Sequence, residues 1–274
     1  MFTIESLEFL QKELESVEKW EKDQKDLWFW EKLGRIPFKL LDKITPKFLQ
    51  DKALQILDEI GSYVQTGGKY LVSGKSILKK FKETGILLEE FAPSDIANLP
   101  LGAMDQTASY FKSSRTKMAA VQGATTGVGG LFTLGIDIPI ILGLSLKTLQ
   151  EIAISYGYNP NSKEERIFII KCLQFASSDY VGKRAILEEL SMTDGERNRQ
   201  AISQLQGWRE VIAAYRDNFG WKKLFQMVPV AGIVFGAFIN KSTIDEVAET
   251  GMMLYRKRRI LERIQQIQQG PADE

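Results

Sequence analysis

Residues 123–157 carry the sequence GATTGVGGLFTLGIDIPIILGLSLKTLQEIAISYG. Six glycines lie between residues 123 and 143, and Asp137 is the one formal charge between Lys117 and Lys147. Residues 140–156 place apolar side chains at the spacing of one helix face, and Gly157 follows as a suitable C-terminal residue. The pattern predicts an apolar, glycine-rich helical segment.

A second segment of this kind is LFQMVPVAGIVFGAFIN, residues 224–240, which has no charged residue. Both segments contain two glycines four residues apart, a spacing that puts them on one helix face and lets another backbone approach closely. Neither segment matches the roughly 20 predominantly apolar residues of a membrane span. A buried core hairpin, insertion into a bilayer and a switch between the two remain open. The predicted helix-packing residues are Gly123, Gly127, Gly232 and Gly236.

The remaining chain also has helical periodicity. Apolar residues recur at helical spacing within residues 1–20, and helices are expected at about 75–82, from 101, and at 183–191, 196–206 and 208–218. Capping patterns start further helices: Ser162 with Glu165 predicts a helix over 163–177, and Ser242 with Asp245 predicts one to about residue 268. No strand or hairpin pattern occurs in the sequence. We expect an all-α multi-helix bundle, with an amphipathic helical region at 1–65, a helical domain at 66–268 and a disordered tail at 269–274.

Composition excludes several classes of chemistry. The chain has no histidine and one cysteine, Cys172, so catalysis by Ser-His-Asp or Cys-His groups and zinc sites built on histidine are excluded. We expect no metal, no cofactor and a buried, inert thiol. The net charge of +1 predicts no general attraction to nucleic acid. The N-terminus has no secretory signal pattern, so a cytoplasmic protein is expected.

Two clusters are candidates for membrane contact. Trp28, Phe29 and Trp30 lie beside basic residues, which suits either a membrane interface or a loop that caps the core. A basic collar, defined as Arg256, Lys257, Arg258, Arg259 and Arg263, suits either anionic lipid headgroups or a solvated helix end.

Several short motifs resemble those of the EcsC family. The first block comprises the glycine-rich run at 123–130, Asp137 two residues before Pro139, Tyr156 before Gly157, and Arg166 with Phe168. The second comprises Pro229 with Gly232, then Gly236, Asn240, and Tyr255 followed by Arg256. The resemblance covers about residues 70–260, with Lys147 where an arginine is expected. It implies a helical fold and a membrane context, because the family is named after a bacterial protein encoded beside an ABC transporter. It brings no catalytic residues.

The polar positions nearest these blocks are candidate ligand-binding residues: Asp137, Arg166, Asn240, Lys241 and Tyr255. Asp137 has two interpretations, a cap for a helix starting near Ile138 or a buried acid that lines a ligand site.

Three functions follow from these patterns. We expect a peripherally membrane-associated protein that binds lipid or assists a membrane transporter, with an anionic membrane surface as partner and no catalytic activity. A soluble protein–protein interaction module is the first alternative. An enzyme that uses Asp, Glu, Lys or Tyr for an undefined reaction is the second.

Overall fold

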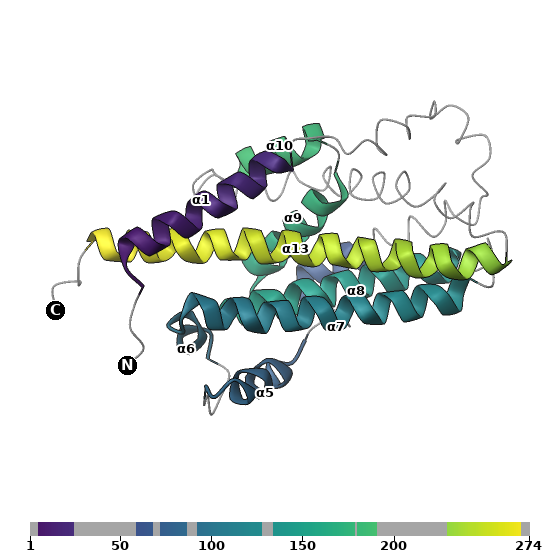
Figure 1. Ribbon diagram of the computed structural model, residues 1–274, viewed down its shortest axis with the longest axis horizontal. Coiled ribbons are helices and arrows are strands. Elements are labelled where there is room, and N and C mark those ends of the chain that lie inside the picture. The colour runs from purple at the N-terminus through teal and green to yellow at the C-terminus, as the bar shows by residue number, and fades with distance from the viewer. Residues whose placement is uncertain are drawn as a thin grey trace.

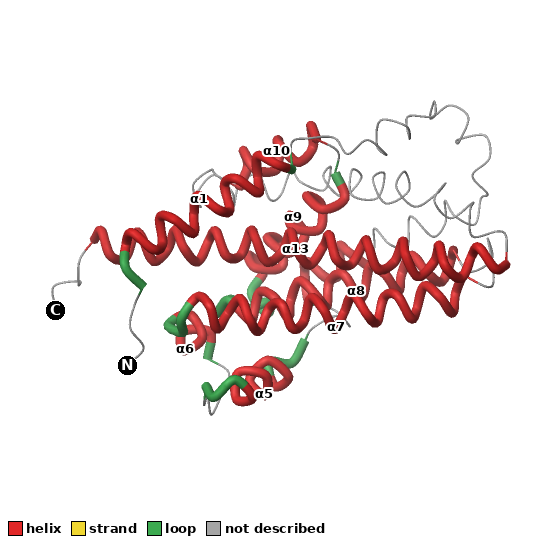
Figure 2. The backbone as a smooth tube through the Cα atoms, in the orientation of Figure 1, coloured by secondary structure: helices red, strands yellow, loops and turns green. Residues whose placement is uncertain are grey.

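The computed structural model describes residues 5–24, 59–67, 72–86, 92–127, 134–178, 180–190 and 229–269 (Figure 1). Side chains at 93, 127, 134–138, 180–181 and 229–236 fall outside this description. The described residues contain helices and no strand (Figure 2), which confirms the all-α prediction. The helices are α1 (Leu7–Asp23), α5 (Lys75–Glu83), α6 (Pro93–Ala97), α7 (Leu101–Gly127), α8 (Leu134–Ser155), α9 (Lys163–Ser177), α10 (Tyr180–Leu190) and α13 (Pro229–Gln269), with a further helical segment at 59–66.

Three long helices form the centre of the molecule. Helix α13 has 41 residues, which at about 1.5 Å per residue gives a length of about 60 Å. Helices α7 and α8 run beside it, and each of the three packs against the other two (Figure 1). The end of α7 and the starts of α8 and α13 lie at the same end of this bundle, on the right in Figure 1.

The shorter helices surround the opposite half of the bundle. Helix α1 packs along the C-terminal half of α13, so the predicted N-terminal region contributes a helix directly to the bundle surface (Figure 1). Helix α9 packs against α8 and α13, and α10 packs against α9. The core includes the fully buried rings of Tyr156, Tyr255 and Phe175.

Local signals predicted several helix ends correctly. Ser162 Oγ accepts a hydrogen bond from the backbone N–H of Glu165 at 3.2 Å, which confirms the capping pattern at the start of α9. Gly157 has φ +80°, and the backbone N–H of Tyr158 donates to the carbonyl of Ala153 at 3.0 Å. Helix α8 therefore ends in a Schellman motif, in which glycine takes the left-handed conformation at no steric cost.

Two predicted helix starts are wrong. Helix α13 begins at Pro229 and continues through Ser242, which is exposed and caps nothing. A cap contributes about 1 kcal/mol, whereas Ile239 and Ile244 are buried on either side of Ser242, so packing keeps the helix continuous. Helix α8 begins at Leu134, so Asp137 lies inside the helix and is not its N-cap.

Other predictions concern residues outside the described ranges. These are the aromatic cluster Trp28, Phe29 and Trp30, the helices expected at 196–206 and 208–218, and residues 270–274 of the predicted tail.

Candidate functional site

The basic collar is occupied by internal partners, beginning with its contacts to α1. Arg256 lies between two acids: it pairs with Glu13 of α1, and its Nε lies 3.0 Å from Asp105 Oδ2 on α7. Lys257 Nζ lies 2.8 Å from Glu21 Oε2, also on α1. Acidic residues of α1 therefore supply carboxylates that fasten this helix to α13.

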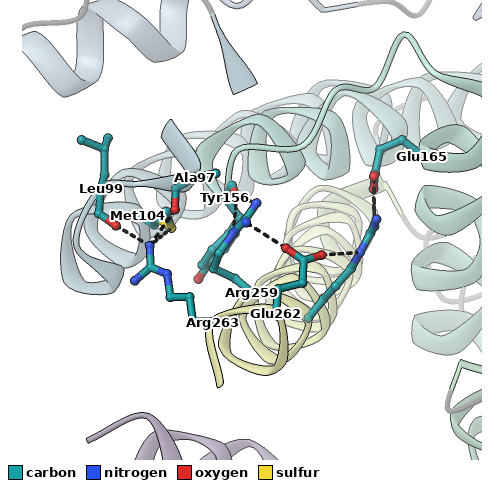
Figure 3. A network of polar contacts seen from close by, with 9 residues as sticks. Ala97, Leu99, Met104, Tyr156, Glu165, Arg259, Glu262 and Arg263 are labelled. Atoms are coloured by element: carbon teal, nitrogen blue, oxygen red, sulfur yellow. Dashed lines mark hydrogen bonds and ion pairs between the residues drawn. The ribbon is translucent and has the colours of Figure 1, made fainter. Parts of the chain in front are cut away.

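Arg263 extends the collar to the start of the bundle. It pairs with Glu5, and its Nη2 donates to the backbone carbonyls of Ala97 and Leu99 (Figure 3). Only 7% of the side chain of Arg263 is exposed. These carbonyls belong to the end of α6 and the residues before α7, so one guanidinium joins three parts of the chain.

Arg259 caps the C-terminal end of α8. Its Nε and Nη2 donate to the backbone carbonyl of Tyr156 at 3.0 and 2.7 Å, and its Nη1 lies 2.8 Å from Glu262 (Figure 3). The last carbonyls of a helix lack intrahelical donors and carry partial negative charge. A buried arginine at this position satisfies both requirements.

Glu165 of α9 is a buried carboxylate that contacts the collar from the inside of the bundle. Its Oε1 accepts a hydrogen bond from the hydroxyl of Tyr255 at 2.6 Å, and its Oε2 lies 2.9 Å from Arg258 Nη1. The guanidinium of Arg258 also stacks over the ring of Tyr158, with 4.2 Å to the ring centre. The local sequence indicates only a helix cap for Glu165, because its partners on α13 are 90 or more residues away.

Burial dominates the electrostatics of this network. It raises the pKa of Glu165, and the ion pair with Arg258 and the hydrogen bond from Tyr255 offset that rise only in part. Burial likewise raises the pKa of Asp105, against the hydrogen bond from Tyr156 and the charge of Arg256. The Cys172 thiol is fully buried, and burial raises its pKa well above the usual value, as expected for an unreactive thiol.

The described structure thus gives the collar a structural role. Its five cations are buried or half-buried, and each contacts a carboxylate or carbonyl of the same chain. A lipid-binding cation has to be free to reach a headgroup. In this conformation the collar therefore offers no unpaired charge for the lipid contacts that were predicted at Arg256, Lys257, Arg258 and Arg259.

The predicted ligand-binding residues do not come together. Arg166 is buried and donates to the carbonyls of Val64, Gln65 and Asn161, which fastens the segment 59–67 to α9. Tyr255 lies in the Glu165 cluster, whereas Asn240 and Lys241 lie about 20 Å away along α13, from a rise of about 1.5 Å per residue. Asp137 is placed only as a backbone position in α8.

A second candidate site is the opposite end of the bundle, where the two glycine-rich segments meet. We call this the apolar end and define it as residues 118–127 of α7, 134–146 of α8 and 229–240 of α13. Asp137 is its one formally charged residue. Asn240 Nδ2 donates to Gln122 Oε1 at 3.4 Å, which joins the two segments although 118 residues separate them.

The apolar end carries large apolar side chains in contact with water. Phe238 is 67% exposed and Val121 66%, more than any other large apolar side chain in the described residues. Met118 and Ile140 are also exposed there. Gly123 is buried, but the glycine with a described close approach to another helix is Gly251, outside both predicted pairs.

Two classes of feature are absent from the described residues. None of the helices there combines the length and apolarity needed to cross a membrane. No group of three or more Cys, Asp or Glu side chains in the described ranges is arranged to hold a metal ion.

Comparison with known proteins places the chain in a family. The model of the EcsC protein family matches residues 11–260, which extends the similarity well before the motif blocks. The uncharacterized protein YdbA of Bacillus subtilis (strain 168) is 59% identical over 265 residues, covering 96% of this chain and 97% of that protein. Protein EcsC of the same organism is 29% identical over 164 residues, covering 60% of this chain and 67% of that protein. No solved structure matches. The chain therefore belongs to the EcsC protein family.

Proposed function

We propose that this protein is a peripheral membrane protein that binds the lipid surface through its apolar end. The observation that carries the proposal is the exposure of Phe238 and Val121 on the two helices that the Asn240–Gln122 contact joins. Exposed apolar side chains that gather in one region, with charges kept to its edge, are typical of surfaces that contact a membrane or another protein.

The distribution of charge supports the same orientation. At the collar, the arginines and the lysine are neutralised by acids of α1, α7 and α9, so these cations are not available to a lipid headgroup. At the apolar end there is almost no charge to desolvate, because the three contributing segments contain only Asp137. Transfer to a lipid interface therefore costs least at the apolar end.

The proposal contains no catalytic step. Its alternative is a protein partner at the same surface, such as a membrane transporter, which would cover the exposed apolar side chains equally well. Lipid is favoured because these exposed side chains come from three separate helices, and a fluid interface accommodates them without a matching shape.

Flotation with protein-free vesicles tests the proposal. Complete burial of a Val or Phe side chain contributes about 1.5–3 kcal/mol, so even partial insertion makes the pair Val121→Ser and Phe238→Ser lower vesicle partitioning by at least about tenfold. The matched control is Phe9→Ser with Leu261→Ser, since both side chains are exposed but lie at the collar end. Circular dichroism checks that both variants remain folded.

The outcomes separate the alternatives. Loss of flotation in the apolar-end variant alone supports lipid binding at this surface. Equal losses in both variants, or no flotation of the wild-type protein, would overturn it. Binding of the wild-type protein to native membranes but not to protein-free vesicles would replace lipid by a protein partner.

A further inference from the structure

Three lysines lie around the inner boundary of the apolar end, one on each long helix. They are Lys117 on α7, Lys147 on α8 and Lys241 on α13, and we call them the lysine belt. All three are exposed, and within the part of the chain that the structure describes none of them forms an ion pair. Beyond them toward the bundle tip, the three segments of the apolar end contain no other basic residue.

Contacts between α7 and α8 put Lys117 and Lys147 at the same level. Arg115 of α7 binds Glu151 of α8 through two hydrogen bonds, one of them 2.6 Å long, which fixes the register of the two helices. Toward the apolar end, Lys117 lies two residues beyond Arg115 and Lys147 lies four residues beyond Glu151. At about 1.5 Å per residue, their levels along the bundle differ by about 3 Å.

A second contact gives the level of Lys241. Thr116 Oγ1 lies 3.5 Å from Asp245 Oδ1, which sets α7 against α13. Lys117 lies one residue beyond Thr116 and Lys241 four residues beyond Asp245, a difference of about 4.5 Å. The lysine belt therefore spans about one helical turn along the bundle axis.

Each lysine shares a helix face with an exposed apolar side chain nearer the tip. Residues three, four or seven apart lie on the same face of a helix. The three pairs are Lys117 with Val121, Lys147 with Ile140, and Lys241 with Phe238. The same order, lysine behind and apolar side chain in front, thus occurs on three helices that come from distant parts of the sequence.

We propose that the lysine belt binds the phosphate groups of anionic lipids, so that the protein selects anionic membranes. This inference rests on the proposed function, because the apolar side chains in front of the belt have to enter the interface first. Lysine suits the boundary, since its aliphatic stem lies along apolar surface while the ammonium stays at headgroup level.

The nearby acids leave the belt positively charged. Glu151 is neutralised by Arg115. Lys112 forms ion pairs with two carboxylates, those of Asp245 at 3.5 Å and of Glu249. Among the described residues at this level of the bundle, these pairs leave one carboxylate without a cation of its own, compared with three lysines that form no ion pair. An anionic surface complements that balance, whereas a neutral surface gains nothing from it.

The test compares vesicles of neutral phosphatidylcholine alone with vesicles that also contain anionic phosphatidylserine. One basic residue near an anionic surface changes partitioning about fivefold, so Lys117→Gln, Lys147→Gln and Lys241→Gln together should weaken binding to anionic vesicles about a hundredfold. Binding to neutral vesicles should not change. Raising the ionic strength should reduce the wild-type preference toward the neutral level.

Two further variants exclude a general charge effect. Replacing three exposed lysines elsewhere, Lys12→Gln, Lys19→Gln and Lys82→Gln, removes the same net charge and should leave the anionic preference intact. Replacing the belt by Lys→Arg keeps the charge and should retain binding.

Failure of the inference differs visibly from failure of the proposed function. Two results would refute the role of the lysine belt without affecting the proposal of lipid binding. One is equal binding of the wild-type protein to both kinds of vesicle, and the other is an equal loss of binding in the belt and control variants. No binding of the wild-type protein to either vesicle would overturn both.

Discussion

Replacement of Gly251 by alanine tests a close approach of α13 to α8. A Cβ built at Gly251 would lie 2.6 Å from Leu149 Cδ2 and 3.5 Å from Ile152 Cδ1. Carbon atoms in contact normally lie about 3.5–4.0 Å apart, so Leu149 would have to move by about 1 Å. Both neighbours are fully buried, which leaves the leucine no exit to solvent.

Two opposing effects set the magnitude. Alanine is favoured over glycine in a helix by about 1 kcal/mol, whereas an extra carbon in a well-packed core costs about 1–3 kcal/mol. We expect Gly251→Ala to lower the free energy of unfolding by up to about 2 kcal/mol. At Gly61, also helical, no heavy atom lies within 4 Å of the added Cβ, so Gly61→Ala should raise the free energy of unfolding by up to about 1 kcal/mol.

Urea denaturation followed by circular dichroism measures both variants. The sharper comparison adds Leu149→Ala, which removes the clashing atom at its own cost of about 2–5 kcal/mol. In that background Gly251→Ala should become neutral or stabilising, giving a favourable coupling energy between the two substitutions. If Gly251→Ala stabilises the wild-type protein as much as Gly61→Ala does, the helices are not in close contact at this glycine.

Three further predictions concern the polar and buried groups. Because the pKa of Glu165 is raised above 4.5, the contribution of this carboxyl group to the free energy of unfolding falls as pH rises. The urea midpoint of Glu165→Gln should therefore increase relative to that of the wild-type protein between about pH 4 and pH 7. A constant difference between the two midpoints over this range would contradict the prediction. Arg263→Lys should lower the free energy of unfolding, measured by urea denaturation, by about 1–3 kcal/mol, because the carbonyls of Ala97 and Leu99 lose a guanidinium donor. An unchanged urea midpoint would show that these hydrogen bonds do not contribute to stability. Cys172 should react with a maleimide only as fast as the protein unfolds, and rapid labelling in native buffer would refute its burial.

Predictions that depended on near neighbours in the sequence were accurate where packing agreed with them. The cap at Ser162 and the helix end at Gly157 each involve atoms within five residues, so the local pattern contains both partners. Ser242 has a similar pattern, yet the helix continues through it, because burial on both sides of that residue outweighs a cap.

The basic collar shows why the candidate site could not be assigned from its own residues. Arg256 and its partner Glu13 are 243 residues apart, and Lys257 and Glu21 are 236 residues apart. Nothing in the local sequence distinguishes a cation that will meet such a partner from one that stays in water. The lysines at 117, 147 and 241 were equally ambiguous, since their common level depends on the register of three helices.

Four properties of this protein could be predicted from its amino-acid sequence alone: the helical class, the positions of most helices in the described ranges, the family and the two glycine-rich apolar segments. These properties follow from periodicity, composition and short motifs, which act over a few turns of chain. Tertiary packing was needed to see that acids and carbonyls of the same chain neutralise the collar. It was also needed to see that the two apolar segments form one end of the bundle with lysines behind it. Charge compensation and surface exposure are properties of residues brought together from distant parts of the chain, and the packing of α1, α7 and α8 on α13 alone decides which residues meet.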